Sequence, residues 1–334
     1  MKNDRNTNKK INYSYELLRL LLCFWVVIHH CFRKANLFKG KFHVPTFMIM
    51  SFYFYYNTLK IKNIKKIKQR YQRILIPYII WPIFIFIFNN ILFKLSGFSL
   101  YGKKLLIKDL VLQLIFGSNY HYIFYYQFNL IFITILFNII SFLFYNNFII
   151  LLQILLIIAY IFQYSYWNFY IFIHYSFVIQ FSLGSIFELL PFAVVGVTLS
   201  YLGLFTMLKK FKVLVILFIG VIIFFILEFD IFVRIKGFWY PGILLNVGGI
   251  CIFILFSLFS FQNRILIFIL KIISKFTGGI YYIHFIFFFL LSRKFFFIQK
   301  KTFRGSLFIY IISYITCYLG NKLSFKTKLN LLFI

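Results

Sequence analysis

Long apolar runs recur along the chain from residue 15 to residue 321, separated by short segments rich in Lys and Arg. Each run has about 17 to 25 residues, the length that a helix needs to cross roughly 30 Å of hydrocarbon. The pattern predicts about ten transmembrane helices, near residues 15–33, 43–59, 74–95, 120–144, 147–163, 185–207, 213–232, 242–261, 278–292 and 306–321. No soluble domain fits between these runs. The sequence therefore predicts an all-α, polytopic membrane helix bundle.

Three segments do not fit this simple pattern. Residues 164–184 are rich in aromatic side chains and are compatible with an interfacial loop, a re-entrant segment or an eleventh span. Residues 102–116 and 264–277 mix Lys with apolar residues at helical spacing. Each of these two is either an interfacial helix or an ordinary connection with a buried face.

Composition narrows the class of protein. The chain has 334 residues, of which 63% are hydrophobic and only 13% are charged, a balance far from that of soluble domains. The formal net charge of +30 does not predict nucleic-acid binding, because the basic residues lie in short loops rather than on one folded face. Membrane anchoring and solvation of the loops account for most of this charge.

The distribution of Lys and Arg predicts the orientation and the domain organisation. Residues 60–73 contain seven basic residues and no acidic one. The positive-inside rule places such a segment in the cytoplasm, together with both termini if there are ten spans. The expected organisation is a cytoplasmic tail at 1–14, one transmembrane domain at 15–321 and a second cytoplasmic tail at 322–334.

Cysteine and histidine spacing does not predict a metal site. The four cysteines lie within or at the edge of predicted spans and form no CxxC pair. The chain has no HExxH, paired-carboxylate or EF-hand spacing. We expect the cysteines to pack as small apolar side chains.

The first apolar run contains an unusual set of ionisable residues, namely Glu16, Arg19, His29 and His30. At 100° per residue, Arg19 and His30 are only about 20° apart around the helix and roughly 16 Å apart along it. Glu16 lies one turn from Arg19, within reach of a salt bridge. His29 is rotated about 80° from Arg19. The spacing therefore predicts a polar stripe of Glu16, Arg19 and His30 that leaves His29 out.

This stripe has two interpretations. A charge inside the membrane costs several kcal/mol unless it is paired or faces water, so such residues are candidates for function. Imidazole titrates near neutral pH and suits His30 to act as a general base. Alternatively, Glu16 and Arg19 form a structural ion pair at the interface, and His30 bonds a neighbouring helix. Residues elsewhere in the chain decide between these interpretations.

Six segments together resemble the acyltransferase-3 family of integral membrane O-acyltransferases of bacterial glycans and lipids. The first is the pattern Glu16-x2-Arg19-x10-His30 in the first span. The others are HVPTFMIMSFYF (43–54), KQRYQRILIPYIIW (68–81), SNYHYIFYYQFNLI (118–131), LPFAVVGVTLS (190–200) and FTGGIYYIHFIFFF (276–289). Leu20, Phe52 and Tyr122 depart from the family pattern, which usually has Gly, Gly and Trp there.

The resemblance implies transfer of an acyl group, most often acetyl from acetyl-CoA, to a hydroxyl of a surface polysaccharide or a lipid-linked glycan. Acyl-CoA is then a donor substrate, with no permanently bound cofactor and no metal. The implied partners are acyl-CoA, the glycan acceptor and the lipid bilayer, not nucleic acid. The implied location is the bacterial cytoplasmic membrane.

The resemblance also implies roles for particular residues. His30 corresponds to the general base, with Arg19, oriented by Glu16, positioning the donor or steadying the oxyanion. The residues expected to hold the CoA phosphates are Arg70, Arg73 and Lys68. The residues expected to line the substrate site are His284, Tyr281, Ser51 and His121. Membrane anchoring by the basic run and helix-to-helix hydrogen bonding by Ser51 and His284 remain the structural alternatives.

A glycan transporter or flippase is the competing class of function, because polar stripes inside spans are equally expected of it. The sequence shows no inverted repeat and no matching pair of helices broken by Gly or Pro. A glycan polymerase is a further alternative, and it would more naturally have a long polar external loop. The acyltransferase interpretation therefore accounts for more of the chain.

Overall fold

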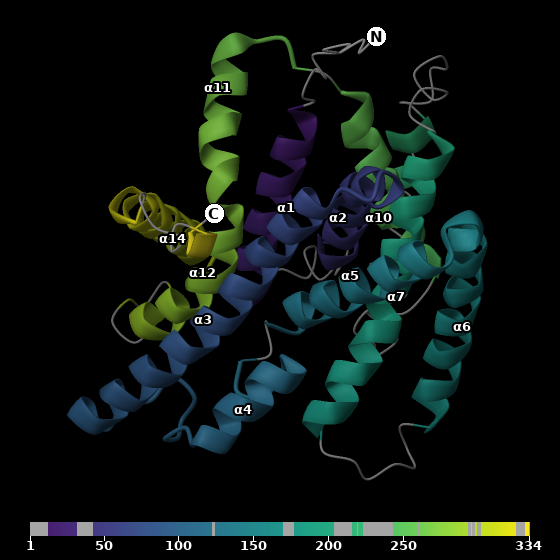
Figure 1. The fold of residues 1–334 in the computed structure, drawn as a ribbon. Helices are drawn as coiled ribbons and strands as arrows, with labels where there is room; N and C mark the ends of the chain where they lie inside the picture. The colour runs from purple at the N-terminus through teal and green to yellow at the C-terminus, as the bar shows by residue number, and fades with distance from the viewer. Residues whose placement is uncertain are drawn as a thin grey trace.

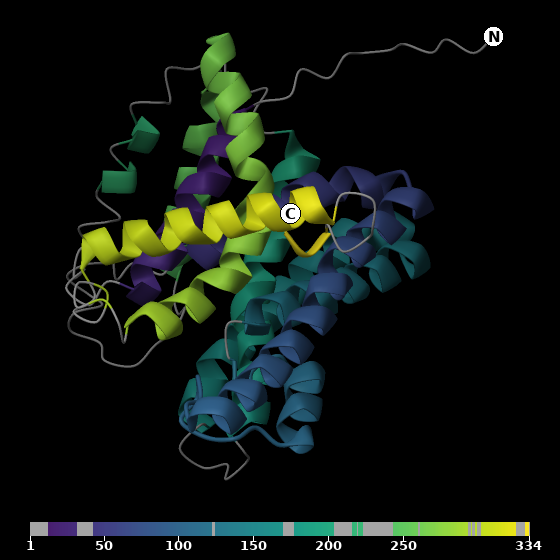
Figure 2. The same cartoon turned by 90° about the vertical axis from the view of Figure 1, so that its left-hand side faces the viewer.

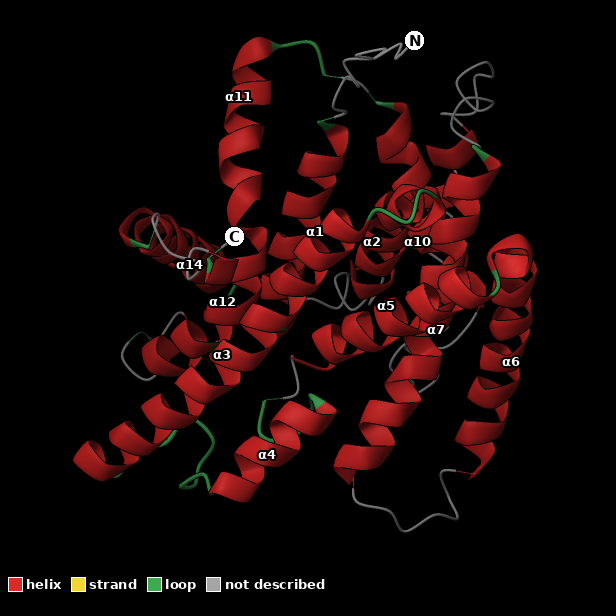
Figure 3. Cartoon of the chain, in the orientation of Figure 1, coloured by secondary structure: helices red, strands yellow, loops and turns green. Residues whose placement is uncertain are grey.

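The computed structural model consists of helices joined by loops. It describes residues 13–31, 43–121, 124–169, 177–203, 216–218, 220–222, 243–259, 261–292, 295, 298, 302–324 and 331–333. No strand occurs in these parts of the chain (Figure 3). The all-α prediction is confirmed, and the helices gather into one bundle (Figure 1).

The first two helices form an antiparallel pair. They are α1 (Ser14–Cys31) and α2 (His43–Lys60). Tyr15, near the start of α1, packs against Phe54, near the end of α2, with ring centroids 4.9 Å apart. His29, near the end of α1, packs against His43, the first residue of α2, at 5.4 Å. Helix α1 therefore contacts α2 near both of its ends.

The third helix, α3 (Ile64–Ser96), begins ten residues before the predicted span. The Asn63 side chain caps it by accepting a hydrogen bond from the Lys66 N–H at 3.0 Å. Gly97 ends it with φ of 64°, a left-handed conformation that favours glycine. The basic segment after α2 is therefore mostly helical rather than a loop, which places its side chains at helical spacing.

The middle of the chain forms a short helix and three long ones. They are α4 (Ile107–Phe116), α5 (Tyr125–Leu143), α6 (Phe148–Phe169) and α7 (Phe177–Leu202), with the 3-10 turn η3 (Tyr145–Asn147) before α6. Helices α6 and α7 lie side by side at one edge of the bundle (Figure 1). Residues 164–169 thus belong to the end of α6, and residues 177–184 belong to the start of α7. An eleventh span there is excluded, because only seven residues separate the two helices.

The last part of the chain contains a long, nearly continuous helical run. Helix α11 (Arg264–Ile273) continues through the 3-10 turn η4 (Ser274–Phe276) into α12 (Thr277–Ser292). Residues 264–277 therefore form a helix that leads without a break into the span predicted at 278–292. Helix α10 (Ile243–Leu258) precedes it, and α14 (Phe303–Leu323) lies across it (Figure 2).

Helix α4 has its polar face inward. Asp109 and Gln113 are buried, whereas Leu106, Ile107 and Ile115 are at least half exposed. The Gln113 side chain donates to the His121 carbonyl at 3.1 Å and accepts from the His121 N–H at 2.9 Å. The inner face of α4 therefore fixes the backbone of His121, and its apolar outer face fits the interfacial alternative.

The described interior contains two hydrophobic cores. The region where they meet, at Phe47 and Ile131, is called the seam. One is built mainly by α2, α5, α6, α7 and α10, and the other mainly by α3, α12 and α14. Helix α1 contributes to both: Leu18 and Leu22 face the first core, and Cys23 and Val27 face the second. Phe47 and Ile131 pack against both cores. The polar stripe of α1 therefore lies where the two cores meet.

Seven of the described helical stretches are long and apolar enough to cross a membrane. Nine of the ten predicted spans coincide with helices, namely those at α1, α2, α3, α5, α6, α7, α10, α12 and α14. The tenth, 213–232, falls largely outside the described residues. A multi-pass membrane protein is therefore confirmed, and the count of ten stays a prediction.

Candidate functional site

The ion pair that the spacing of α1 predicts is present. An Arg19 Nη2 atom lies 2.6 Å from Glu16 Oε2. The same Nη2 donates a hydrogen bond to the Ser274 carbonyl at 2.6 Å, where α11 passes into α12. Both charged side chains remain about one third exposed. Arg19 thus joins α1 to the α11–α12 run while it keeps access to solvent, and Arg73 of α3 lies within electrostatic range of it.

A cluster of histidines lies at the opposite end of α1. His30 packs against His284 of α12 with ring centroids 5.6 Å apart, and against His29 at 5.4 Å. His29 in turn packs against His43 of α2 at 5.4 Å. His121 also lies within electrostatic range of His30. Five of the six histidines of the chain therefore gather here, and the sixth, His174, is outside the described residues.

This grouping changes the interpretation of His29. The spacing on α1 alone sets His29 apart from the polar stripe, but His29 connects His30 with His43. A single-helix projection cannot include His43, because it belongs to another helix. In the described part of the chain, no three His, Cys, Asp or Glu side chains are placed to hold one metal ion. The cluster is thus a set of imidazoles suited to proton transfer and hydrogen bonding.

Phe285 provides the apolar platform of the cluster. Its ring lies 5.6 Å from His30, 5.2 Å from His121 and 6.1 Å from His284, measured between centroids. The His121 Nδ1 atom is 2.7 Å from the Tyr101 hydroxyl. Because Gln113 holds the backbone of His121 as well, this ring is fixed from two sides. The loop before α5 therefore delivers its histidine to the same place as α1, α2 and α12.

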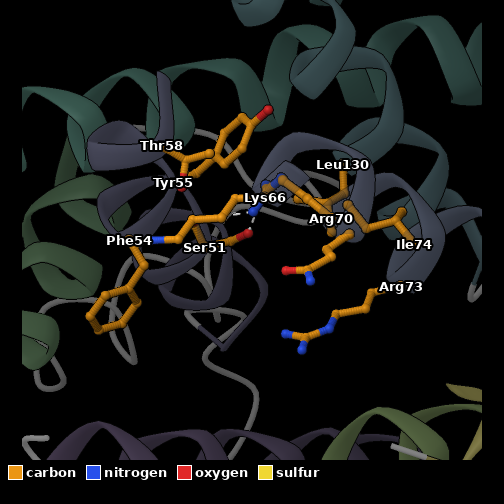
Figure 4. A pocket seen from close by; sticks show the side chains of 10 residues that line it. Ser51, Phe54, Tyr55, Thr58, Lys66, Arg70, Arg73, Ile74 and Leu130 are labelled. Atoms are coloured by element: carbon orange, nitrogen blue, oxygen red, sulfur yellow. Dashed lines mark hydrogen bonds between the residues drawn. The ribbon is translucent and has the colours of Figure 1, made fainter. Parts of the chain in front are cut away.

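A cavity of about 350 Å³ lies beside the start of α3 (Figure 4). It is lined by Ser51, Phe54, Tyr55, Thr58, Lys66, Gln69, Arg70, Arg73, Ile74 and Leu130. Three of these residues are cationic and none is acidic. The four polar residues from α3 occupy positions 66, 69, 70 and 73, which share one face of a helix. The cavity is therefore a cationic pocket whose cations all come from one face of α3, with residues of α2 and α5 completing its wall.

The structure places Lys68 away from this pocket. Lys68 is exposed, but it is not among the residues that line the cavity, because it is rotated about 200° from Arg70 on α3. Lys66 and Gln69 take its place. Neither residue is predicted from hydropathy, which places the start of this span at residue 74. Starting the helix at the Asn63 cap gives the i, i+3, i+4, i+7 spacing that identifies them.

Arg70 is held in place on all sides. Its guanidinium carbon lies 4.1 Å from the ring centroid of Tyr55 and 4.9 Å from that of Phe52. It donates to Ser51 Oγ at 3.0 Å and to Thr134 Oγ1 at 3.2 Å. Figure 4 shows Arg70 directed at Ser51, whereas Arg73 extends separately. Arg70 therefore fixes α3 to α2 and α5, and Arg73 and Lys66 are better placed to meet a ligand.

These contacts explain one departure from the family pattern. Phe52 stands where the family usually has glycine, and it is fully buried against Phe137, with ring centroids 4.9 Å apart. Its ring fills the space beside the Arg70 guanidinium. The bulky residue thus supports the basic helix instead of loosening the packing. Ser51 both lines the cavity and makes a helix-to-helix hydrogen bond with Arg70, and its use in substrate binding stays a prediction.

Aromatic side chains connect the cavity with the histidine cluster along the seam. Tyr126 of α5 lies within electrostatic range of Arg70. Tyr126 packs against Tyr281 of α12, with ring centroids 6.0 Å apart. Tyr281 then packs against His284 at 6.3 Å. Tyr126 and Tyr281 are only partly buried although they lie inside the bundle. A path of polar rings therefore runs from the cationic pocket to the imidazoles.

A family model described as an acyltransferase domain, that of the acyltransferase-3 family, matches residues 12–322. The chain belongs to this family. The match covers α1 to α14, so both the cationic pocket and the histidine cluster lie within the family domain. No match was found among curated proteins or among solved structures. The chain is thus a membrane acyltransferase that transfers groups other than amino-acyl groups.

Leu332 and Phe333, which follow α14, pack back against α3, α12 and α14. The Leu332 carbonyl accepts a hydrogen bond from Trp81 Nε1 at 3.3 Å. Phe333 packs so closely on Gly279 and Gly320 that a Cβ atom at either glycine would overlap it. Trp81 also stacks on Tyr282, with centroids 6.0 Å apart. These contacts fix the rotation of α12, and with it the direction of His284.

Proposed function

We propose that the protein is a membrane O-acyltransferase that transfers an acyl group, most simply acetyl, from acyl-CoA to a hydroxyl of a surface polysaccharide or lipid-linked glycan. The donor binds at the cationic pocket, and the acceptor hydroxyl meets the histidine cluster. The observation that carries this proposal is the pairing of the two sites across one seam, within a domain of the acyltransferase-3 family.

The positive charge of the cationic pocket is suited to binding an anionic donor. CoA carries phosphates, which lysine and arginine side chains bind through charge-assisted hydrogen bonds. Lys66 and Arg73 are exposed at the pocket, and no carboxylate among the lining residues competes for them. Arg19 lies within electrostatic range of Arg73 and adds positive charge on the side of α1. In this proposal Arg70 mainly holds the pocket in shape.

The histidine cluster supplies the base. His30 takes the proton of the acceptor hydroxyl as its oxygen forms a bond to the thioester carbonyl carbon. The carbon–sulfur bond then breaks, and the CoA thiolate leaves and takes up a proton. The proton lost by the hydroxyl and the proton gained by the thiolate therefore balance. Arg19 lies roughly 16 Å from His30 along α1. Its proposed role is therefore donor positioning, with Glu16 holding the guanidinium, rather than stabilisation of the oxyanion.

The same arrangement gives the proposed orientation. Acyl-CoA is a cytoplasmic metabolite, so the pocket end of α1 faces the cytoplasm and the histidine end faces outward. The termini then lie on the cytoplasmic side, in agreement with the basic residues at the start of α3. We place the protein in the bacterial cytoplasmic membrane on this basis.

Two neighbouring lysines provide the sharpest test of donor binding. Lys66 lines the pocket, whereas Lys68 is exposed on another face of the same helix. We expect Lys66→Ala to raise the KM for acetyl-CoA about tenfold, the equivalent of roughly 1.4 kcal/mol. Lys68→Ala removes the same charge and is expected to change it less than about twofold. The measurement is transfer of label from acetyl-CoA by protein in nanodiscs. Equal effects of the two changes would contradict the pocket assignment.

A glycan transporter remains the competing proposal, because a polar seam between two cores also suits a translocation path. Donor dependence separates the two functions. An acyltransferase binds labelled acetyl-CoA and transfers the label to a glycan. Movement of a lipid-linked sugar across proteoliposomes, without any binding of acyl-CoA, would favour the transporter instead.

A further inference from the structure

His284 presents one ring nitrogen without a partner. Its ring is fully buried, and Nδ1 lies 3.0 Å from the Ile280 carbonyl of its own helix. A carbonyl only accepts hydrogen bonds, so Nδ1 carries the proton and Nε2 is left with its lone pair in the neutral ring. This Nε2 is a buried atom with no hydrogen-bond partner among the described residues. Because a buried acceptor left unpaired is costly, Nε2 points to a ligand that donates a hydrogen bond.

The surroundings of this nitrogen match a hydroxyl-rich ligand. The His30 and His284 rings are tilted by only 31° and their centroids are 5.6 Å apart. His121 lies on another side of Phe285, and its Nε2 is also buried without a partner in the described structure. Tyr101 and Gln113 fix His121 from outside. The cluster therefore surrounds the proposed base with further imidazole nitrogens, and no three of the described residues form a metal site there.

We propose that His284 is a specificity-determining residue: its Nε2 accepts a hydrogen bond from a hydroxyl next to the one that is acylated. The site then selects acceptors with hydroxyls on adjacent carbon atoms, as sugar rings have, over single alcohols. A site built to hydrogen-bond a hydroxyl rejects a molecule that lacks it, because the buried nitrogen is left unpaired. This inference rests on the proposed function and adds the residue, and the ring nitrogen, that recognise a second hydroxyl of the acceptor.

The test compares ethylene glycol with ethanol, which differ by one hydroxyl. The full-length protein in nanodiscs is given labelled acetyl-CoA and each alcohol in turn. We expect the wild-type protein to use ethylene glycol at least about tenfold better by kcat/KM. His284→Leu removes the acceptor and is expected to lower the ratio to about two, the value that two equivalent hydroxyls give. His284→Gln, which restores an acceptor oxygen, is expected to recover part of the preference.

The possible outcomes separate this inference from the proposed function. A wild-type ratio near two overturns the inference and leaves the acyltransferase function intact. An equal loss on both alcohols in His284→Leu also overturns it, because His284 then positions His30 rather than the acceptor. Binding of acetyl-CoA without transfer to either alcohol overturns it too, since the site is proposed to recognise the hydroxyls themselves. Failure to bind acetyl-CoA at all removes the proposed function and the inference with it. Thermal unfolding of each variant shows that the fold is intact.

Discussion

The cationic pocket and the histidine cluster differ in how the chain builds them. The pocket takes its cations from one face of α3, within eight consecutive residues, and its side chains are partly exposed. The cluster takes its histidines from α1, α2, α12 and the loop before α5, and most of these rings are buried. One site is charged and local in sequence, and the other is assembled from imidazole rings that lie far apart in the sequence.

The proposed roles of the two sites account for this difference. Phosphates are charged and need cations that remain near water, where exchange of the donor is fast. A general base works best where its neighbours hold it in one orientation beside the group whose proton it takes. If the two sites have these separate roles, changes at the pocket should affect donor binding alone, and changes at the cluster should affect turnover or acceptor use without affecting donor binding.

Removal of the base is expected to have the largest effect. His30→Ala should lower kcat by about 100-fold or more, the usual contribution of a general base, while acetyl-CoA binding stays unchanged. His29→Ala removes the contact between His30 and His43 and is expected to cost less than about tenfold, because it disturbs only the orientation of the base. The measurement is single-turnover transfer with saturating donor. A larger loss for His29→Ala would contradict the polar stripe of α1.

A change in α7 is expected to affect both sites at once. Gly196 packs against the backbone of Ile49, so a Cβ atom there would overlap the Ile49 carbonyl. Helix α2 carries His43 at one end and Ser51 at the pocket, so a shift of α2 reaches both sites. We expect Gly196→Ala to destabilise the protein by about 2 kcal/mol and to lower donor affinity and turnover together.

Gly220→Ala is the matched control, since a Cβ atom there meets nothing within 4 Å. Thermal unfolding in detergent and binding of acetyl-CoA provide the two measurements. If Gly196→Ala lowers turnover alone, the two sites do not share α2 as their common support.

The sequence predicts the local features of this arrangement better than the long-range ones. Helical spacing was enough to predict the ion pair of Glu16 with Arg19, because both partners lie on one turn. Spacing along α1 set His29 aside, because its partner His43 belongs to a different helix. The seam between the two cores depends on how α1 packs on α2 and α12, and no pattern within one helix contains that information.

The remaining differences between the predicted and the observed structure arise where helices begin and end. The start of α3 was placed at residue 74 because apolar content begins there, although the Asn63 cap and the helical spacing of the basic residues mark an earlier start. Lys66 and Gln69 were missed for this reason. Likewise, hydropathy separated 264–277 from the span that follows, whereas hydrogen bonding continues through the turn at Ser274. Charged and mixed ends of spanning helices are thus where hydropathy is least informative.

The role of Arg70 gives a third test, of intermediate size. Arg70→Lys keeps the charge but loses the planar guanidinium that stacks on Tyr55 and Phe52 and bonds Ser51 and Thr134. We expect donor affinity to fall about tenfold, with an accompanying loss of thermal stability, since the pocket loses its support. Retention of both properties would show that charge alone matters at this position. Turnover with saturating donor should be unchanged.

The smallest expected effect concerns Asp109, which supports the histidine cluster from outside through α4. Its carboxylate accepts from the Leu106 N–H at 2.8 Å and lies 3.7 Å from Lys103 Nζ. Burial raises the pKa of Asp109, but the hydrogen bonds from Leu106 and Asn119 and the nearby Lys103 and Lys108 bring it below the usual value. A carboxyl whose pKa is lower in the folded state stabilises the fold fully above its unfolded pKa. This contribution disappears as the pH falls through the folded pKa.

We therefore expect Asp109→Asn to reduce stability by about 1 kcal/mol at neutral pH, and the difference from the wild-type protein to shrink below about pH 4. Because α4 holds the His121 backbone through Gln113, the same variant should raise the KM for the acceptor while leaving acetyl-CoA binding unchanged. Lys104→Gln, an exposed change in the same loop, serves as the control. Thermal unfolding between pH 3 and pH 7 together with acceptor titrations would check both parts. A weaker affinity for acetyl-CoA in Asp109→Asn would show that the loop before α5 supports the pocket as well. The two sites would then not have independent supports.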